Sequence, residues 1–244
     1  MDWMRRLLGG RGQKRDAFVR RPMMGKSFRD IGRSTGTDKV THHGYHRFYP
    51  FFLELMRDQP ITMLEIGTQK NKSLRLWEQY FPHATIYGVD IGNGFKFARG
   101  EVFKGDQGDR AFLETVMHNI GKRVELIVDD GSHKPEHQLD TFILLFDQLL
   151  KDGGIYIIED IETNYWTKGT CYGYQIERGF GHQVSVIEIF KNIVDLTNIE
   201  FVKDRSVFDR SPLPANVRDQ IALVSFQYNS IIVVKKDAES GPLT

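Results

Sequence analysis

The chain has 244 residues, of which 40% are hydrophobic, enough to bury one substantial core. Its 33 basic and 32 acidic residues nearly cancel, so overall charge gives no reason to expect a nucleic-acid partner. The single cysteine, Cys171, excludes an internal disulfide and a cysteine zinc cluster, and no apolar run is long enough to span a bilayer.

The N-terminal segment differs from the rest in charge. Between Met1 and Lys26 there are eight Lys or Arg residues and only two acids, Asp2 and Asp16. The opening run MDWMRRLLGG lacks the apolar core of a secretory signal, so we expect a cytoplasmic location. We predict that residues 1–30 form a basic extension and that residues 31–244 form a single domain.

From Ile61 onward, β-type runs alternate with helical patterns. Strands are expected at 61–67, 85–90, 101–106, 124–130 and 153–160, and helices at 73–81, 109–120 and 135–150. The helix at 135–150 has apolar residues at i, i+3, i+4 and i+7 spacing and Pro135 in its first turn. Gly153 and Gly154 are expected to close it.

This alternation predicts an α/β fold, a doubly wound and mostly parallel sheet with helices on both faces. Such sheets bind ligands at the carboxyl ends of their strands. Here those ends carry many acids: Glu65, Asp90, Asp106, Asp129, Asp130, Glu159 and Asp160. We therefore expect the functional site at this edge.

Two further β runs end the patterned part of the chain. Residues 221–228 and 230–236 are joined by a tight connection at Asn229, so they must pair as an antiparallel hairpin. A mostly parallel, seven-stranded sheet that ends in such a hairpin is characteristic of class I methyltransferases. Nicotinamide-binding Rossmann domains usually lack the hairpin.

The strand ends offer ligands for S-adenosylmethionine. The first strand ends EIGTQKNKS, with Gly67 alone and no GxGxxG, which provides poorly for a pyrophosphate. Asp90 can accept both ribose hydroxyls, and Asp106 and Gln107 can hydrogen-bond adenine. Taken singly, each acid could instead be a helix cap.

A second set of acids predicts a metal site. If strands four and five are neighbours, Asp130, Glu159 and Asp160 converge, and Mg²⁺ would relieve their repulsion. Alternatively, one acid caps a helix and another pairs with Lys or Arg. His133 lies where a general base is needed. A two-histidine iron site with His137 is disfavoured by the intervening proline and the excess of carboxylates.

Aromatic residues on the loop after the fifth strand could stack on an acceptor, although ordinary packing explains them equally well. They are Tyr165, Trp166, Tyr172 and Tyr174. Three histidines near Tyr45 and Tyr49 could cover the cofactor. They are His42, His43 and His46.

With these residues identified, the chain resembles the macrocin and mycinamicin O-methyltransferase family, metal-dependent enzymes that methylate sugars. The resemblance runs from GTDK at Gly36 through VDDGSH to IIEDIETNYW, and TQKNK replaces a longer glycine-rich insertion. It implies Mg²⁺ bound by Asp130, Glu159 and Asp160, and His133 as the base. The implied contacts with S-adenosylmethionine are Glu65, Gly67, Ser73, Asp90, Asp106, Gln107 and Asp130. It also implies a homo-oligomer in which N-terminal segments help to close neighbouring sites.

The function predicted is Mg²⁺-dependent transfer of a methyl group from S-adenosylmethionine to a hydroxyl of a small-molecule acceptor, a sugar of a glycosylated natural product. Three alternatives stay open. The acceptor could be a catechol-like phenol, or the chain could be a relative of the cephalosporin-hydroxylase-like proteins. It could also be a non-catalytic binding module.

Overall fold

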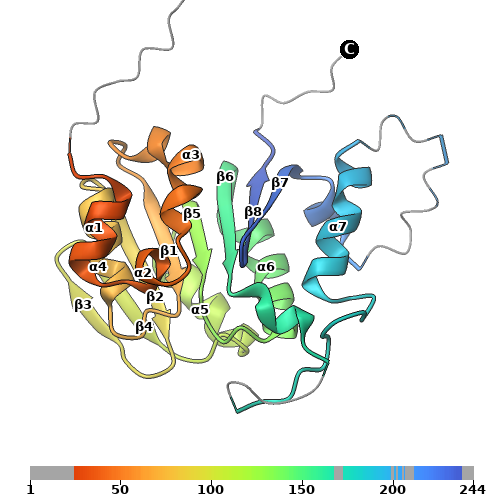
Figure 1. Cartoon of the computed structure of the whole chain (residues 1–244), viewed down its shortest axis with the longest axis horizontal. Helices are drawn as coiled ribbons and strands as arrows, with labels where there is room; N and C mark the ends of the chain where they lie inside the picture. The colour runs from red at the N-terminus through yellow and green to blue at the C-terminus, as the bar shows by residue number, and fades with distance from the viewer. Residues whose placement is uncertain are drawn as a thin grey trace, which may run out of the picture.

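A mixed sheet organises the described part of the chain, which comprises residues 25–167, 173–198, 201, 203–204, 206 and 212–237 of a computed structural model (Figure 1). Its eight strands lie in the order β3-β4-β2-β1-β5-β6-β8-β7. Their bounds are β1 Thr62–Ile66, β2 Thr85–Asp90, β3 Phe95–Phe97, β4 Gly100–Lys104, β5 Val124–Asp129, β6 Leu150–Glu159, β7 Ile221–Gln227 and β8 Ser230–Lys235.

The strand directions confirm the predicted fold class. β4, β2, β1, β5 and β6 run parallel, and β8 pairs antiparallel with both β6 and β7. The C-terminal hairpin therefore forms as expected, with β8 inserted beside the parallel strands. The sheet has eight strands and not the seven predicted. The additional strand is β3, a three-residue edge strand antiparallel to β4, which the sequence does not reveal because so short a run carries no periodicity.

Helices cover both faces of the sheet. One core contains side chains from α1, α3 and α4, and the other from α5, α6 and α7. Figure 1 shows α1 to α3 in front of the sheet and α6 behind it. The α-helices are α1 Phe28–Thr35, α2 Asp38–Thr41, α3 Tyr49–Leu53, α4 Lys72–Tyr80, α5 Arg110–Ile120, α6 Pro135–Gln148, α7 Val186–Thr197 and α8 Ala215–Arg218, and the 3-10 helices are η1 Tyr45–Arg47, η2 Glu54–Met56 and η3 Ile161–Tyr165.

The packed part of the chain begins before the boundary expected at residue 31. Helix α1 starts at Phe28, whose side chain is buried against Tyr49 and Trp77, and Ser27 caps the helix by accepting a hydrogen bond from the Asp30 amide. Residues 1–24 of the predicted extension lie outside the described residues. No helix within the described ranges is long and apolar enough to cross a membrane.

The junction between α6 and β6 differs from the expectation. The helix ends at Gln148, and Gly153 and Gly154 lie inside β6 rather than at the end of the helix. Gly153 has a φ of 73°, and the pairing of β5 with β6 shifts register between Val124 and Leu126. The glycines therefore accommodate an irregularity in the strand.

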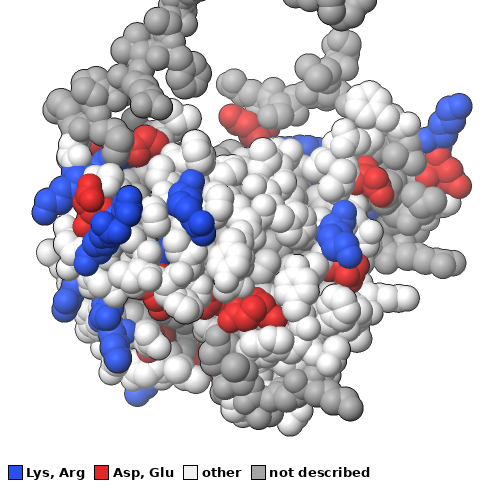
Figure 2. All heavy atoms as spheres, viewed as in Figure 1, with Lys and Arg blue, Asp and Glu red and all other residues white. Residues whose placement is uncertain are grey.

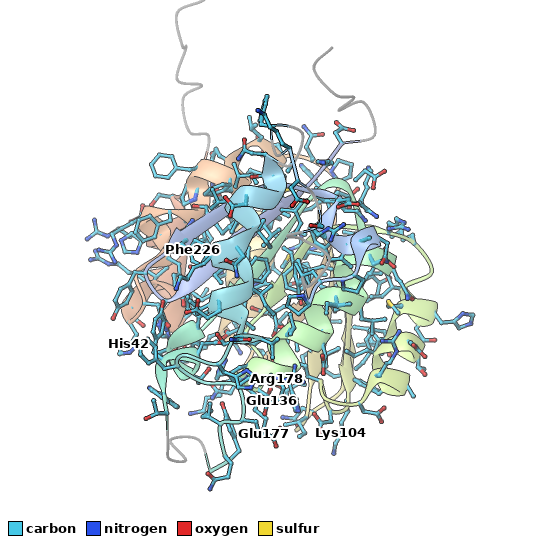
Figure 3. All side chains as sticks on the ribbon, turned by 90° about the vertical axis from the view of Figure 1, so that its right-hand side faces the viewer. His42, Lys104, Glu136, Glu177, Arg178 and Phe226 are labelled. Atoms are coloured by element: carbon cyan, nitrogen blue, oxygen red, sulfur yellow. The ribbon has the colours of Figure 1, made fainter. Side chains whose placement is uncertain are left out.

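The carboxyl ends of the parallel strands share one edge, the lower edge in Figure 1. Figure 3 labels His42 just after α2, Lys104 at the end of β4 and Glu136 in the first turn of α6, and all three lie in the lower half of that view. The N-terminal helices α1 and α2 thus lie against the sheet close to the edge at which ligands are expected.

Candidate cofactor and metal site

A cavity of about 620 Å³ lies along the carboxyl ends of the strands. Every residue expected to bind the cofactor or the metal, or to act as the base, lines it except Glu65 and Glu159. Those that line it are Gly67, Ser73, Asp90, Asp106, Gln107, Asp130, His133 and Asp160. The N-terminal segment contributes Gly36, Thr37, Asp38 and Thr41 to the same wall. One cavity therefore joins the expected cofactor residues to the expected metal residues.

Gly67 allows two strand ends to approach closely. Its φ is 84°, a conformation that residues with a side chain rarely adopt. A Cβ at this position would overlap the carbonyl oxygen of Asp130. The glycine is therefore required because the loop after β1 lies directly against the backbone that leaves β5.

Asp90 is fixed by backbone amides at the end of β2. Its Oδ2 accepts a hydrogen bond from the Gln69 amide at 2.7 Å, and its Oδ1 accepts one from the Gly92 amide at 2.8 Å. The carboxylate lines the cavity and is nevertheless only 9% exposed. Its orientation is therefore set before any ligand arrives, which suits a residue expected to bind ribose hydroxyls.

Asp106 and Gln107 differ in how much of their hydrogen-bonding capacity the protein uses. Gln107 Nε2 donates to both Asp129 oxygens, at 2.8 and 2.9 Å, and Gln107 Oε1 accepts from the Ser132 amide. Burial raises the pKa of Asp129 to about 7, and the hydrogen bond from Gln107 opposes that rise. Asp106 is exposed, with its Oδ1 accepting from the Gly108 amide. Asp106 is thus the freer of the two for a ligand.

Glu65 lies behind the cavity wall. It is 0% exposed and accepts hydrogen bonds from Ser73 Oγ at 2.8 Å and from Trp77 Nε1 at 2.9 Å. Burial raises its pKa, and the Lys39 ammonium counters that rise. The structure therefore places Ser73 on the cavity and holds Glu65 one layer deeper, where its oxygens are engaged by the protein.

Asp130, His133 and Asp160 form a cluster that can hold a cation. Each offers one ligand atom, and these atoms lie within 4.8 Å of one another. Burial and the neighbouring Asp130 carboxylate raise the pKa of Asp160 to about 7. Two carboxylates with an imidazole fit a divalent cation, because a double positive charge removes the repulsion that disfavours their ionised forms.

Glu159, the third expected metal ligand, is not part of this cluster. It is 1% exposed, its Oε2 accepts from Lys39 Nζ at 2.7 Å, and its Oε1 accepts from Tyr49 Oη at 2.8 Å. Because adjacent residues at a strand end face opposite ways, Asp160 faces the cavity and Glu159 the interior. The alternative of an acid paired with a lysine is thus realised at Glu159.

Lys39 is the main site residue that the sequence did not single out. It is 0% exposed, and its Nζ lies 2.6 Å from Asp130 Oδ2 and 3.4 Å from Glu65 Oε1. Burial alone would lower the Lys39 pKa, but the Asp130 and Glu159 carboxylates outweigh it and hold that pKa well above its ordinary value. The one signal for Lys39 in the sequence was its place in the GTDK run.

Stacked rings connect the N-terminal segment to the carboxylates. His43 stacks on Tyr45, and Tyr45 stacks on Tyr49, with centroid separations of 5.2 and 5.0 Å. Tyr45 Oη donates to Asp160 Oδ1 at 3.1 Å. His43 Nδ1 lies 3.4 Å from the same oxygen. Tyr45 and His43 therefore both contact Asp160 of the candidate cation site. His42, in contrast, is exposed.

Two residues of the cluster have unusual backbone conformations. His133 has a φ of 57° and Asp160 a φ of 53°, both in the left-handed region. Such conformations cost on the order of 1–3 kcal/mol each for residues with a side chain and persist only where the surroundings enforce them. Here the Thr163 hydroxyl donates to the His133 carbonyl at 2.6 Å, and Asn229 Nδ2 donates to Asp160 at 2.9 Å.

The loop aromatics and His137 lie outside this arrangement. Neither Tyr165 nor Trp166 nor Tyr174 lines the cavity, and Tyr172 is not among the described residues. His137 Nδ1 lies 3.0 Å from Ser132 Oγ and is not part of the candidate metal cluster, which contains a single histidine. The geometry thus does not support a two-histidine site.

Curated relatives confirm the resemblance to sugar O-methyltransferases, although no family model matches the chain. It is 35% identical over 140 residues to 8-demethyl-8-alpha-L-rhamnosyl tetracenomycin-C 2'-O-methyltransferase of Streptomyces olivaceus, covering 54% of this chain and 36% of that one. It is 36% identical over 133 residues to mycinamicin VI 2''-O-methyltransferase of Micromonospora griseorubida, covering 50% and 33%. The match thus spans about a third of each relative's length.

Solved structures confirm the class I methyltransferase fold. MycE methyltransferase from the mycinamycin biosynthetic pathway, in complex with Mg and SAH, superposes with a TM-score of 0.75 at 26% identity, covering 89% of this chain and 55% of that one. Its complex that also contains mycinamycin VI gives 0.74 at 24% identity, covering 91% and 57%.

Proposed function

We propose that this chain transfers a methyl group from S-adenosylmethionine to a sugar hydroxyl of a glycosylated small molecule, with Mg²⁺ as cofactor. One observation carries the proposal: a single cavity is lined by Asp90 at one strand end and by Asp130, His133 and Asp160 at others. A nucleoside cofactor and a cation could therefore bind side by side, so that an acceptor hydroxyl held at the cation would lie next to the methyl group it receives.

The cofactor half of the proposal rests on the ends of β1, β2 and β4. Gly67 permits close approach, the held carboxylate of Asp90 accepts ribose hydroxyls, and the exposed Asp106 accepts from the adenine amine. Ser73 and Gln107 complete the wall, and Glu65 fixes the Ser73 hydroxyl from behind.

In the metal half, Asp130 and Asp160 would hold Mg²⁺, and Glu159 contributes its charge from the inner layer. When bound, Mg²⁺ lowers the pKa of a coordinated hydroxyl. His133 Nε2 takes the proton of the acceptor hydroxyl, and Asp160 Oδ2, 3.7 Å away, stabilises the imidazolium that forms. The acceptor oxygen then bonds to the methyl carbon as the carbon–sulfur bond breaks, and its electron pair stays on sulfur.

The sugar acceptor is proposed from the relatives, which are named as O-methyltransferases of a rhamnosyl tetracenomycin, of mycinamicin VI and of an olivosyl oleandolide. A cytoplasmic location and a homo-oligomeric assembly are further parts of the proposal. The structural support for assembly is apolar exposure on α3 and η2, where Phe51 is 83% and Leu55 is 89% exposed. Figure 2 shows that the centre of this face of the molecule is largely uncharged.

Two variants test the two halves separately. Asp90→Asn should abolish thermal stabilisation by S-adenosylmethionine and leave Mn²⁺ binding intact, whereas Asp160→Asn should do the reverse. Asp140→Asn, which changes an exposed carboxylate on α6, serves as the matched control.

Activity is then measured as a mass increase of one methyl group on rhamnosylated aromatic and macrolide acceptors, with catechol as a comparison. Full activity in excess EDTA would exclude the metal role. Stabilisation by NAD alone would point to a dinucleotide enzyme. Methylation of catechol without methylation of the glycosides would reassign the acceptor.

A further inference from the structure

Lys39 links three neighbouring strands through their acids. Its Nζ lies 2.6 Å from Asp130 Oδ2 after β5, 2.7 Å from Glu159 Oε2 at the end of β6, and 3.4 Å from Glu65 Oε1 in β1. The side chain is 0% exposed. A fully buried ammonium with three carboxylate partners is not a solvated surface lysine that happens to lie near acids.

The backbone that carries Lys39 is itself held in place. Lys39 belongs to α2, in which the Thr41 hydroxyl donates to the Thr37 carbonyl at 2.9 Å and the Val40 side chain is buried. Gly32 of α1 lies directly against Val40, since a Cβ on that glycine would overlap the valine side chain. The ammonium therefore has a fixed position relative to the sheet.

The charges of the cluster require an internal cation. Glu65, Asp130, Glu159 and Asp160 bring four carboxylates to adjacent strand ends, and neighbouring strands are about 4.8 Å apart. Without Lys39, Asp130 and Glu159 would face each other unpaired, and each would turn away or take up a proton. Both oxygens of Glu159 are bound from the protein side, by Lys39 and by Tyr49.

We propose that Lys39 is a positioning residue of the cation site, which holds Asp130 and Glu159 together from behind so that Asp130 meets a divalent cation in one orientation. Lys39 engages Oδ2 of Asp130, and the same carboxylate lines the cavity. Oδ1 can therefore serve the cation while Oδ2 is restrained. This inference rests on the proposed metal site and deepens it.

The test measures cation binding without turnover. Mn²⁺ is titrated into metal-free full-length protein and followed by electron paramagnetic resonance. Lys39→Met should weaken Mn²⁺ binding at least ten-fold and leave the affinity for S-adenosylmethionine within two-fold, a separation that general unfolding could not produce. Lys122→Met is the matched control, because Lys122 is exposed, does not line the cavity and forms no ion pair with any described residue. It should bind Mn²⁺ like the wild type.

A second variant covers the case in which Lys39→Met does not fold. The double variant Lys39→Met, Glu159→Gln removes both charges of the buried pair, so no lone charge is left inside, and it should also bind Mn²⁺ at least ten-fold more weakly. The inference is overturned if either folded variant binds Mn²⁺ with an affinity equal to or higher than that of the wild type. A higher affinity would show that Lys39 competes with the metal. Failure of the wild type to bind Mn²⁺ overturns the metal site as well.

Discussion

Asp129 should make the stability of the metal-free protein depend on pH. Its carboxyl is 1% exposed, and burial raises its pKa from the ordinary 3.8 to about 7. A carboxyl with a raised pKa keeps its proton in the folded state at a pH where the unfolded chain has lost it. The contribution of Asp129 to stability is therefore fully present below about pH 4, falls as pH rises, and is lost above about pH 7.

The size of this effect follows from the two pKa values. The interval between 3.8 and about 7 corresponds to about 4 kcal/mol lost across the range. One proton per molecule gives a slope of about 1.4 kcal/mol per pH unit within that window. Asp160, whose pKa is also raised to about 7, contributes in the same direction. The wild type should therefore have a steeper slope than a single group produces.

Urea unfolding in EDTA at half-unit steps from pH 4.5 to 8 measures that slope. Asp129→Asn removes one titrating group, so its free energy of unfolding should fall less steeply than that of the wild type, by about 1.4 kcal/mol per pH unit below pH 7. Equal slopes for the two proteins would refute the reasoning.

Two other substitutions probe the framework. Gly67→Ala should destabilise the protein by more than about 3 kcal/mol, because the strain of a left-handed alanine adds to the overlap of its Cβ with Asp130. It should also lower thermal stabilisation by S-adenosylmethionine, and a wild-type melting temperature would contradict the prediction. Lys235→Met should lower the free energy of unfolding in urea by about 1–3 kcal/mol, since the buried ammonium donates to the Phe146 and Leu150 carbonyls. Mn²⁺ binding should not change. An unchanged free energy of unfolding would contradict the role of the ammonium.

The sheet and its ligand edge could be predicted because they depend on local patterns. Apolar runs of strand length alternate with helical periodicity, and the tight connection at Asn229 leaves only an antiparallel hairpin for the last two strands. Parallel strands then bring Asp90, Asp130 and Asp160 to one edge whatever the details of packing.

The inner layer of the site could not be predicted in this way. Lys39 is 91 residues from Asp130 and 120 from Glu159 in the sequence, and it belongs to a four-residue helix with little periodicity. Whether a lysine is solvated or buried among acids depends on how the N-terminal helices pack on the sheet. No local pattern encodes that packing.

The different environments of Glu159 and Asp160 show the same limit at finer scale. The sequence places both at the end of one strand and suggests one shared role. The turn at Asp160, with a φ of 53°, sends its carboxylate to the cavity and leaves Glu159 facing Tyr49 and Lys39. A left-handed aspartate is rare enough that sequence reasoning would not assume one.

These features place a stability cost at the edge where function is proposed. The site combines the strained backbones of His133 and Asp160 with a carboxylate, that of Asp160, whose pKa is raised by burial. A ligand that binds only the folded state recovers part of that cost, about 2.7 kcal/mol at a concentration one hundred times its dissociation constant. Lys39 supplies one positive charge to Glu65, Asp130 and Glu159, so net negative charge remains in the cluster, and Asp130 and Asp160 line the cavity. A divalent cation would therefore bind on the cavity side of the cluster, opposite Lys39, where an acceptor hydroxyl can reach it.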